Sequence, residues 1–300
     1  MMRFIFSFVV LSLCFSAVGG DEIRVLKVGQ KPESVCRGFA GKLFVTVIEG
    51  EEPGDGGINR LDGDNVTEFC RGMNSPKGMA FVGGFLIVAD ETSVWKVDQK
   101  GRPSILAKKD DFPAPIEFLN DVAASRDGKS VYVTEMSHPK WMFDPDGERK
   151  LWPVDNKTVK PPMTGCVYRV SLDGKITLRV PAGNQVMPGP NGVTVGGNGN
   201  NELLVMADFF TGNIVSHDGK NFRVIASGMR GADGVALGQD AIYVSSWSLG
   251  KVWKVDRKTK STKVLAKDFT TAADFYYDRK NSQLIIPDML EGTLTFLKLQ

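Results

Sequence analysis

Four polar residues stand directly before short hydrophobic stretches of the chain, although up to 200 positions separate them: Glu33, Asn120, Asn191 and Asp233. Together they offer two carboxylates and two carboxamides, a donor set whose ligating atoms are oxygens. Oxygen ligands suit a hard cation, and Ca²⁺ tolerates an irregular set of them better than Mg²⁺, which is the second choice. Zinc would prefer nitrogen or sulfur. If the fold gathers these four residues, they predict a site for calcium or another divalent metal.

The composition agrees with oxygen chemistry and excludes several classes of protein. His138 and His217 are the two histidines among 300 residues, which disfavours a histidine-ligated zinc site. Lys and Arg (37) nearly balance Asp and Glu (35), so we expect no nucleic-acid partner. Hydrophobic residues make up 42% of the chain, as in globular proteins, which argues against a disordered or collagen-like chain.

A repeat of about forty residues supplies the elements that must position the four polar side chains. Each copy begins with a turn and a hydrophobic strand, continues with a second strand that ends near an acidic residue, and closes with a third strand after a glycine turn. Aligning the copies stacks the apolar residues Val35, Met79, Val122, Val193, Val235 and Phe275. The position two before each of these holds Glu33, Lys77, Asn120, Asn191, Asp233 and Ala273.

Six such units predict an all-β protein, a six-bladed β-propeller of four-stranded antiparallel blades over residues 21–300. A β-sandwich is the alternative, but six copies in register argue against it. We expect residues 23–28 to add the outermost strand of the last blade and so close the ring. The residues before the inner strands should then face one another at one mouth of the central channel. Lys77 would either meet an anionic substrate there or point away, and any single polar residue of the set could be only a turn residue.

The loops at the same mouth should form the wall of a pocket. The candidates after the second strands are Glu49, Glu91, Phe209, Phe210, Trp247 and Asp288. The aromatic residues among them could instead pack between blades. Residues 137–165 form a loop-like insertion in the third blade, with Trp141 and Trp152, and predict a partial lid from which His138 could reach a substrate.

The N-terminal segment 1–20 has one arginine, an apolar run and small residues before Asp21, as in a secretory signal peptide. A membrane anchor is the alternative, but the run is short for a span. We therefore expect a secreted or periplasmic protein that is not membrane-bound after cleavage and is a monomer. The three remaining cysteines, Cys36, Cys70 and Cys166, predict buried free thiols, with Cys36 and Cys70 as the pair nearest in sequence.

This layout resembles the group formed by senescence marker protein, gluconolactonase and luciferin-regenerating enzyme, the SGL propellers. The resemblance covers roughly residues 22–300 and is most specific at PES (32–34), LND (119–121), PNGVTV (190–195) and ADGVAL (232–237). It implies a six-bladed propeller with a divalent metal, often calcium, and the hydrolysis of lactones or related esters. It also implies that Glu33, Asn191 and Asp233 are metal ligands, that Asp233 is the general base, and that Asn120 lies near metal and substrate.

The sequence departs from this group at two places. Ser34 and Val35 follow Glu33, where the group usually has Gly and Pro. Phe118 stands two residues before Asn120, where the sugar-lactonase members have an arginine. The second departure weakens the case for a sugar-acid lactone as substrate and leaves the metal ligands in place.

Three functions follow from these observations. The leading hypothesis is a secreted, calcium-dependent hydrolase of small lactones or esters, with Asp233 and Asn120 as catalytic residues. Its pocket would include Lys77, Phe118, His138, Trp141, Phe209, Phe210 and Trp247. The alternative is a non-catalytic propeller that calcium stabilises and that binds a ligand or protein on this face. A propeller of the strictosidine synthase type, which would not need the oxygen-rich set, is the third.

Overall fold

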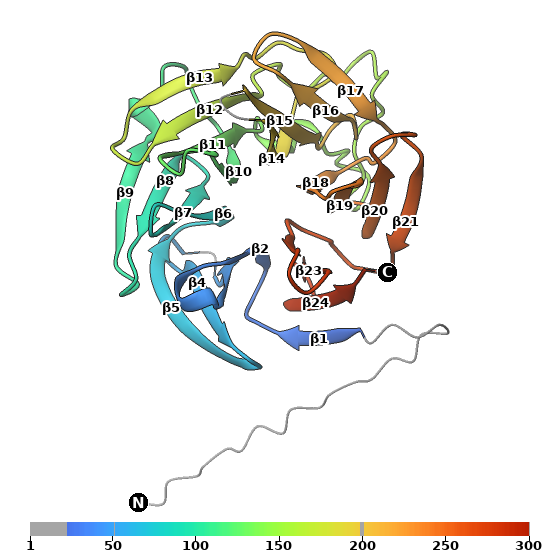
Figure 1. Ribbon diagram of the computed structural model, residues 1–300. Coiled ribbons are helices and arrows are strands. Elements are labelled where there is room, and N and C mark those ends of the chain that lie inside the picture. Colours follow the sequence, from blue (N-terminus) through green and yellow to red (C-terminus); the bar gives the residue numbers. More distant parts are fainter. Residues whose placement is uncertain (1–22, 51, 199–200, 300) are drawn as a thin grey trace, which may run out of the picture.

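The computed structural model describes residues 23–50, 52–198 and 201–299 and has six four-stranded antiparallel sheets arranged as blades around one axis (Figure 1). The predicted six-bladed propeller is therefore confirmed. The predicted signal peptide at 1–20 lies outside the described residues.

Within the described residues, the strands follow the repeat in chain order. The first blade and the closing strand contain β1 (Arg24–Lys27), β2 (Pro32–Arg37), β3 (Leu43–Val47), β4 (Gly56–Asp62) and β5 (Asn65–Met73). The second and third blades contain β6 (Pro76–Val82), β7 (Phe85–Asp90), β8 (Ser93–Val97), β9 (Pro103–Lys108), β10 (Leu119–Ala124), β11 (Ser130–Glu135), β12 (Cys166–Ser171) and β13 (Ile176–Val180). The fourth and fifth contain β14 (Pro190–Asn198), β15 (Asn201–Asp208), β16 (Ile214–His217), β17 (Phe222–Ala226), β18 (Ala232–Leu237), β19 (Ala241–Ser246), β20 (Lys251–Asp256) and β21 (Thr262–Ala266). The sixth contains β22 (Tyr276–Asp278), β23 (Gln283–Asp288) and β24 (Thr293–Lys298).

The ring closes as the sequence predicts. Strand β1 pairs antiparallel with β24, from Arg24 opposite Phe296 to Lys27 opposite Thr293, so the sixth blade is built from both ends of the described chain. In Figure 1, β1 lies beside β24 at the outside of this blade. The guanidinium of Arg24 also lies 3.8 Å from the centre of the Phe296 ring. The closing strand thus covers an edge that would otherwise be unpaired.

Among the described residues the hydrophobic core forms seven clusters, and six of them each fill the space between two neighbouring blades. The stacked apolar residues of the repeat belong to these clusters; Val122, for example, packs in the cluster between the second and third blades. The strands alternate in composition so that each sheet presents apolar side chains to both neighbours. Burial between blades therefore holds the ring together and fixes the angle at which each inner strand meets the axis.

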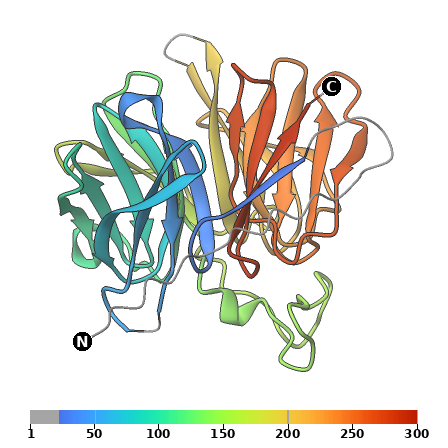
Figure 2. The ribbon, with the colours of Figure 1, turned by 90° about the horizontal axis from the view of Figure 1, so that it is seen from below.

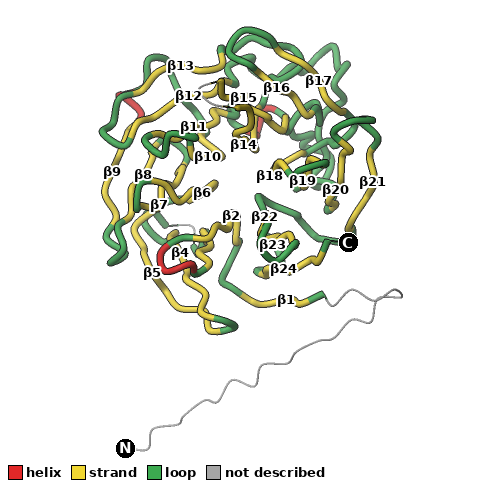
Figure 3. The backbone as a smooth tube through the Cα atoms, in the orientation of Figure 1, coloured by secondary structure: helices red, strands yellow, loops and turns green. Residues whose placement is uncertain are grey.

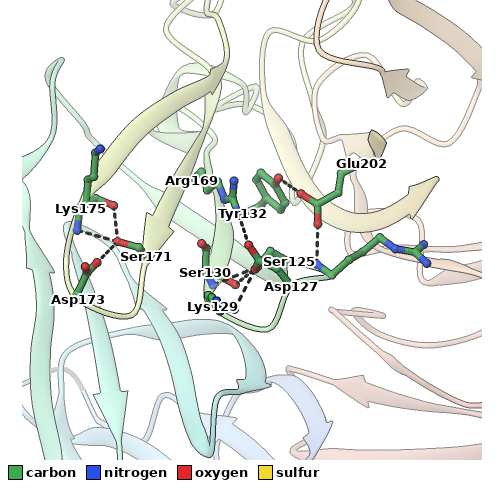
Figure 4. Close-up of polar contacts among 11 residues, drawn as sticks. Ser125, Asp127, Lys129, Ser130, Tyr132, Arg169, Ser171, Asp173, Lys175 and Glu202 are labelled. Carbon is green, nitrogen blue, oxygen red and sulfur yellow. Dashed lines mark hydrogen bonds and ion pairs between the residues drawn. The ribbon is translucent and has the colours of Figure 1, made fainter. Parts of the chain in front are cut away.

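Turns and loops connect the strands of each blade (Figure 3), and side-chain contacts add to them. Gly83 and Gly84 join β6 to β7 with positive φ angles of 57° and 81°, which a two-residue hairpin requires. In the turn between β10 and β11, Asp127 accepts a hydrogen bond from the Ser125 hydroxyl and forms an ion pair with Arg169 (Figure 4). Glu202 of the fourth blade accepts from the Tyr132 hydroxyl and ties the two blades together.

Helical structure is confined to three 3₁₀ turns in the described ranges: η1 (Phe39–Gly41), η2 (Lys109–Asp111) and η3 (Pro139–Trp141). Across these same ranges, the structure has no helix of the length and apolarity that a bilayer crossing needs. The insertion at 137–165 connects β11 to β12 and contains η3. Figure 2 shows this segment, in light green, projecting from one face of the ring.

Candidate functional site

A break in strand pairing displays the polar residues of the repeat. In five blades the inner strand pairs with the next strand at its first residue, skips two residues, and resumes at the stacked apolar residue. The first skipped residues are Glu33, Lys77, Asn120, Asn191 and Asp233, called the ring residues below. Such bulges reorient side chains and recur next to active sites.

All five ring residues line a single cavity of about 130 Å³. Each is buried, with an exposed fraction between 2% for Asn191 and 7% for Lys77. Residues that are far apart in the sequence therefore meet at the axis, as the alignment of the repeats predicts. Ala273, the sixth residue of the aligned set, is fully buried and is not part of this lining, whereas Met289 of the same blade is.

Four oxygen atoms in this cavity lack a hydrogen-bond partner: Glu33 Oε2, Asn120 Oδ1, Asn191 Oδ1 and Asp233 Oδ1. Across the described residues these are all the buried side-chain oxygens without a partner, and the other unpartnered atoms are arginine Nε groups. Buried polar atoms are nearly always paired, because an unpaired one loses its hydration without compensation. Four unpaired acceptors around one cavity therefore fit a cation.

The amide group of Asn120 shows how one of these oxygens is oriented. Its Nδ2 donates to the sulfur of Met136 at 3.8 Å, which leaves Oδ1 for the cavity. Among the described residues no group of three or more His, Cys, Asp or Glu side chains is arranged to hold a metal ion. The ring offers two carboxylates and two carboxamides instead, a mixed oxygen set of the kind that calcium accepts.

Hydroxyl groups on alternate blades fix the main chain of the ring. Thr46 accepts from the amide N of Ser34 at 2.9 Å and donates to the Lys77 carbonyl at 3.0 Å. Thr134 joins Asp121 N to the Asn191 carbonyl, at 2.8 and 2.7 Å.

Ser245 repeats this bridge in the fifth blade, between Gly234 N at 2.9 Å and the Ala273 carbonyl at 2.8 Å. In each case one hydroxyl accepts a hydrogen bond from a main-chain N–H in the bulge of its own blade. It also donates to the main-chain carbonyl of the aligned residue in the next blade. The positions of neighbouring ring residues are therefore coupled.

Two further carboxylates, which we did not predict, lie directly beneath the ring. Asp121 accepts from Val122 N and Val193 N, each at 2.6 Å, and so joins the third and fourth blades. Asp274 accepts from the Ser34 hydroxyl at 2.5 Å and joins the sixth and first. Both also line a second cavity of about 340 Å³ on the other side of the ring.

A signal for these two residues was present in the repeat. The next position of the six aligned copies holds Ser34, Gly78, Asp121, Gly192, Gly234 and Asp274, so three copies have a side chain that can bridge blades and three have glycine. The glycines leave room for the bridges, since a Cβ on Gly78 would lie 2.4 Å from Asp121 Oδ1.

Burial dominates the electrostatics of the ring. Burial raises the pKa of both Glu33 and Asp233 well above the ordinary value, and nearby carboxylates add to the rise. Burial likewise raises the pKa of Asp121 to about 6. Without a cation the ring therefore holds its carboxylates in an unfavourable environment. A bound divalent cation would relieve this electrostatic strain.

Lys77 is the cationic member of the ring. Its ammonium donates to the Ser75 hydroxyl at 2.8 Å and lies 5.4 Å from the centre of the Phe118 ring. Burial lowers the pKa of Lys77, while Glu33 and other carboxylates oppose this effect. Lys77 thus faces the cavity and does not point away from it.

An apolar wall completes the cavity. Its members are Phe118, Met136, Pro139, Phe143, Phe209, Trp247 and Met289. Pro139 and Phe143 come from the insertion at 137–165, whose apolar side chains pack against Phe209 and Trp247. Phe143 lies edge-on to both rings, with centroids 5.8 Å apart in each case. The insertion therefore supplies part of the cavity wall.

Three residues predicted for the pocket lie outside the lining. Phe210 is buried beneath Arg230, whose guanidinium is 5.0 Å from the centre of the ring. His138 packs edge-on against Phe118, with ring centroids 5.5 Å apart, and its Nδ1 accepts from Lys140 N. Trp141 is 46% exposed, so it faces solvent.

The acidic candidates at the strand ends lie outside the cavity, and contacts of the described residues account for two of them. Asp288 accepts from Thr270 N at 2.8 Å and from Thr271 N at 3.0 Å, and thereby orders the loop before the sixth inner strand. Glu49 lies 3.6 Å from Arg71 in an ion pair. Neither Glu49, Glu91 nor Asp288 is part of the cavity lining.

The three cysteines of the described part are free and buried. Burial raises the pKa of the Cys70 thiol to about 11 and that of Cys166 to about 12. These thiols are therefore protonated and poor nucleophiles at neutral pH.

Comparison with models of protein families and with curated proteins finds no match. The fold is that of a solved structure from Xanthomonas campestris described as a gluconolactonase, with a TM-score of 0.69 and 18% sequence identity. The similarity covers 94% of this chain and 91% of that one. It establishes a shared propeller fold along nearly the whole length of both chains.

Proposed function

We propose that this chain is a calcium-dependent hydrolase of lactones or related esters. The observation that carries the proposal is the set of four unpaired oxygens from Glu33, Asn120, Asn191 and Asp233 around one cavity. The similarity in fold to a protein described as a gluconolactonase supports the choice of lactones. Cleavage of residues 1–20, as the sequence predicts, would make this hydrolase a secreted or periplasmic protein.

In this proposal Glu33, Asn191 and Asp233 would hold the cation. Asn120 would lie beside the cation and contact the substrate. When bound, the cation would supply positive charge that polarises an ester carbonyl and stabilises the oxyanion of the transition state. Asp233 would accept the proton of the attacking water, since its unpaired Oδ1 lies at the cavity where that water would sit. Oxygen from water would form a bond to the acyl carbon, the ester C–O bond would break, and the leaving alkoxide would take up a proton.

The cavity also supports small substrates. Its volume of about 130 Å³ admits a monocyclic lactone, and its aromatic wall would exclude bulk water from the reacting carbonyl. The carboxamide of Asn120 would orient the substrate. Neither a cysteine nor His138 belongs to the cavity lining, so the proposal assigns the attack on the ester to water.

The test is hydrolysis of a panel of monocyclic lactones and aryl esters by the purified protein, first with EDTA and then after adding back Ca²⁺. Turnover that EDTA abolishes and Ca²⁺ restores is the expected result. Glu33→Gln and Asp233→Asn should abolish it while preserving the volume of the side chains. Arg169→Met, which removes an exposed ion pair at the other end of the third blade, is the matched control.

Calcium-dependent melting without turnover on any member of the panel would contradict the proposed activity. That result would favour a propeller whose cation is structural and whose face binds a ligand. Activity that persists in both EDTA and the two carboxylate variants would contradict the proposed metal site itself.

A further inference from the structure

Lys77 is a buried cation with unused hydrogen-bonding capacity. An ammonium has three N–H donors, and the Ser75 hydroxyl takes one of them. No carboxylate of the described residues lies within ion-pair distance of Lys77 Nζ. The side chain is nevertheless 93% buried and lines the cavity, since its exposed fraction is 7%. A partner for this group must come from whatever occupies the cavity.

The carboxylates near Lys77 are engaged elsewhere. Asp90 accepts from the amide N of Asn74, from that of Ser75 and from the Trp95 indole. Glu91, the other nearby acid, lies outside the cavity lining.

Glu33 and Asp233 share the cavity with Lys77, and their two negative charges would balance a divalent cation. With that cation bound, the positive charge of Lys77 would remain without a counter-charge in the cavity.

The remainder of the cavity restricts the rest of the ligand. Outside the five ring residues, its lining consists of aromatic, methionine and proline side chains. The indole N–H of Trp247 donates to the Met289 sulfur at 3.2 Å and is therefore already used. A polyhydroxylated ring would bury hydroxyl groups against this wall without partners, which is unfavourable.

We propose that the site selects small lactones or esters that have an apolar ring and carry one carboxylate, and that Lys77 is the residue that binds this carboxylate. This inference rests on the proposed hydrolase function and adds the substrate class. Lys77 would pair with the anion in a cavity shielded from solvent, where such a pair is strongly favourable when its alternative is an unpaired charge. The carboxylate would anchor the ring so that its ester carbonyl faces the cation site.

Three monocyclic lactones test the proposal with the calcium-loaded protein. They are γ-carboxy-γ-butyrolactone, its neutral methyl analogue γ-valerolactone, and glucono-δ-lactone, which carries hydroxyl groups. We expect the highest kcat/KM for the carboxylate lactone. Lys77→Met should lower that value about 30-fold or more, the effect of removing one partner of a buried charge pair, and should change little for the methyl analogue. Lys77→Arg retains the charge and should restore part of the preference.

A binding measurement makes the test independent of turnover. The hydroxy diacid formed from γ-carboxy-γ-butyrolactone should bind the calcium-loaded protein in a calorimeter, and Lys77→Met should weaken this binding by a similar factor. Circular dichroism and thermal melting confirm that each variant is folded.

Equal kcat/KM for the carboxylate and methyl lactones, a preference for glucono-δ-lactone, or diacid binding that survives Lys77→Met would overturn the proposal. Diacid binding that depends on Lys77, without hydrolysis of any lactone, would support the anion site and contradict the hydrolase function alone. The two proposals can therefore fail separately.

Discussion

The Thr134 hydroxyl donates a hydrogen bond of 2.7 Å to the main-chain carbonyl of Asn191, in the neighbouring blade. The same oxygen accepts from Asp121 N at 2.8 Å. One buried hydroxyl thus fixes the main chain at two places beside the cavity. Equivalent hydroxyls of Thr46 and Ser245 do the same in the first and fifth blades.

Thr134→Val should lower the free energy of unfolding by about 1–3 kcal/mol, because it leaves a buried N–H and a buried carbonyl unpaired. It should also weaken Ca²⁺ binding, since Asn191 loses its support. Denaturant unfolding and calorimetry measure the two effects. Thr134→Ser, which keeps the hydroxyl, is the matched control. Equal Ca²⁺ affinity in the Val variant and the parent protein would show that this bridge does not position the ring.

Calcium should raise the melting temperature of the protein. At a calcium concentration one hundred times Kd, binding to the folded state adds about 2.7 kcal/mol, a shift of roughly 5 °C or more for a chain of this size. Asp233→Asn should eliminate most of the shift. Asp62→Asn, which alters an exposed carboxylate paired with Lys42, should retain it. A shift of the same size in the Asp233 variant would place the calcium elsewhere.

Asp208 should make stability depend on pH. Burial raises the pKa of this carboxyl to about 6, so the folded chain retains a proton that the unfolded chain releases above pH about 4. The free energy of unfolding should therefore fall as the pH rises from about 4 to about 6, by up to about 3 kcal/mol for this group.

Asp208→Asn removes the titrating group and should flatten this part of the profile. Urea unfolding at a series of pH values, in EDTA, measures both curves. The difference between the slopes isolates Asp208, since the other buried carboxylates are common to both proteins. Parallel profiles would exclude the contribution expected here.

Arg230 should hold the insertion against the propeller. Its guanidinium donates to the Trp152 carbonyl at 2.5 Å and lies over the Phe210 ring. Arg230→Met should therefore accelerate hydrogen exchange and proteolysis within residues 137–165, because both contacts are lost. Arg169→Met, which removes an exposed ion pair with Asp127 and no contact of Arg230, should leave these rates unchanged. Unchanged protection in the Arg230 variant would show that apolar packing alone fixes the segment.

The repeat made the fold and the ring residues predictable. A propeller places equivalent positions of every copy around one axis, so aligning the copies was enough to bring Glu33 and Asp233 together from 200 positions apart. The closing strand was predictable for the same reason, because the last copy lacked its fourth strand. Both inferences depended on periodicity and required no knowledge of side-chain packing.

The cavity wall was less predictable because it does not follow the repeat. Met136, Phe143 and Met289 reach the cavity from loops of different length, and nothing in the sequence distinguishes Phe209, which lines it, from Phe210, which does not. His138 was expected to reach the substrate, but its ring packs edge-on against Phe118. Orientation within an insertion depends on its contacts, which the sequence pattern does not contain.

The seam between β1 and β24 has a consequence for the order of events during synthesis. Residues 24–27 are made before the six inner strands and have no partner until residues 293–298 follow, so the nascent chain carries an unpaired strand while all the residues between them are made. The blades can form one after another, but the ring residues are not held around one axis until β1 pairs with β24. A chaperone or a translocation system that keeps the two ends apart would thus delay assembly of the site, even with every blade already folded.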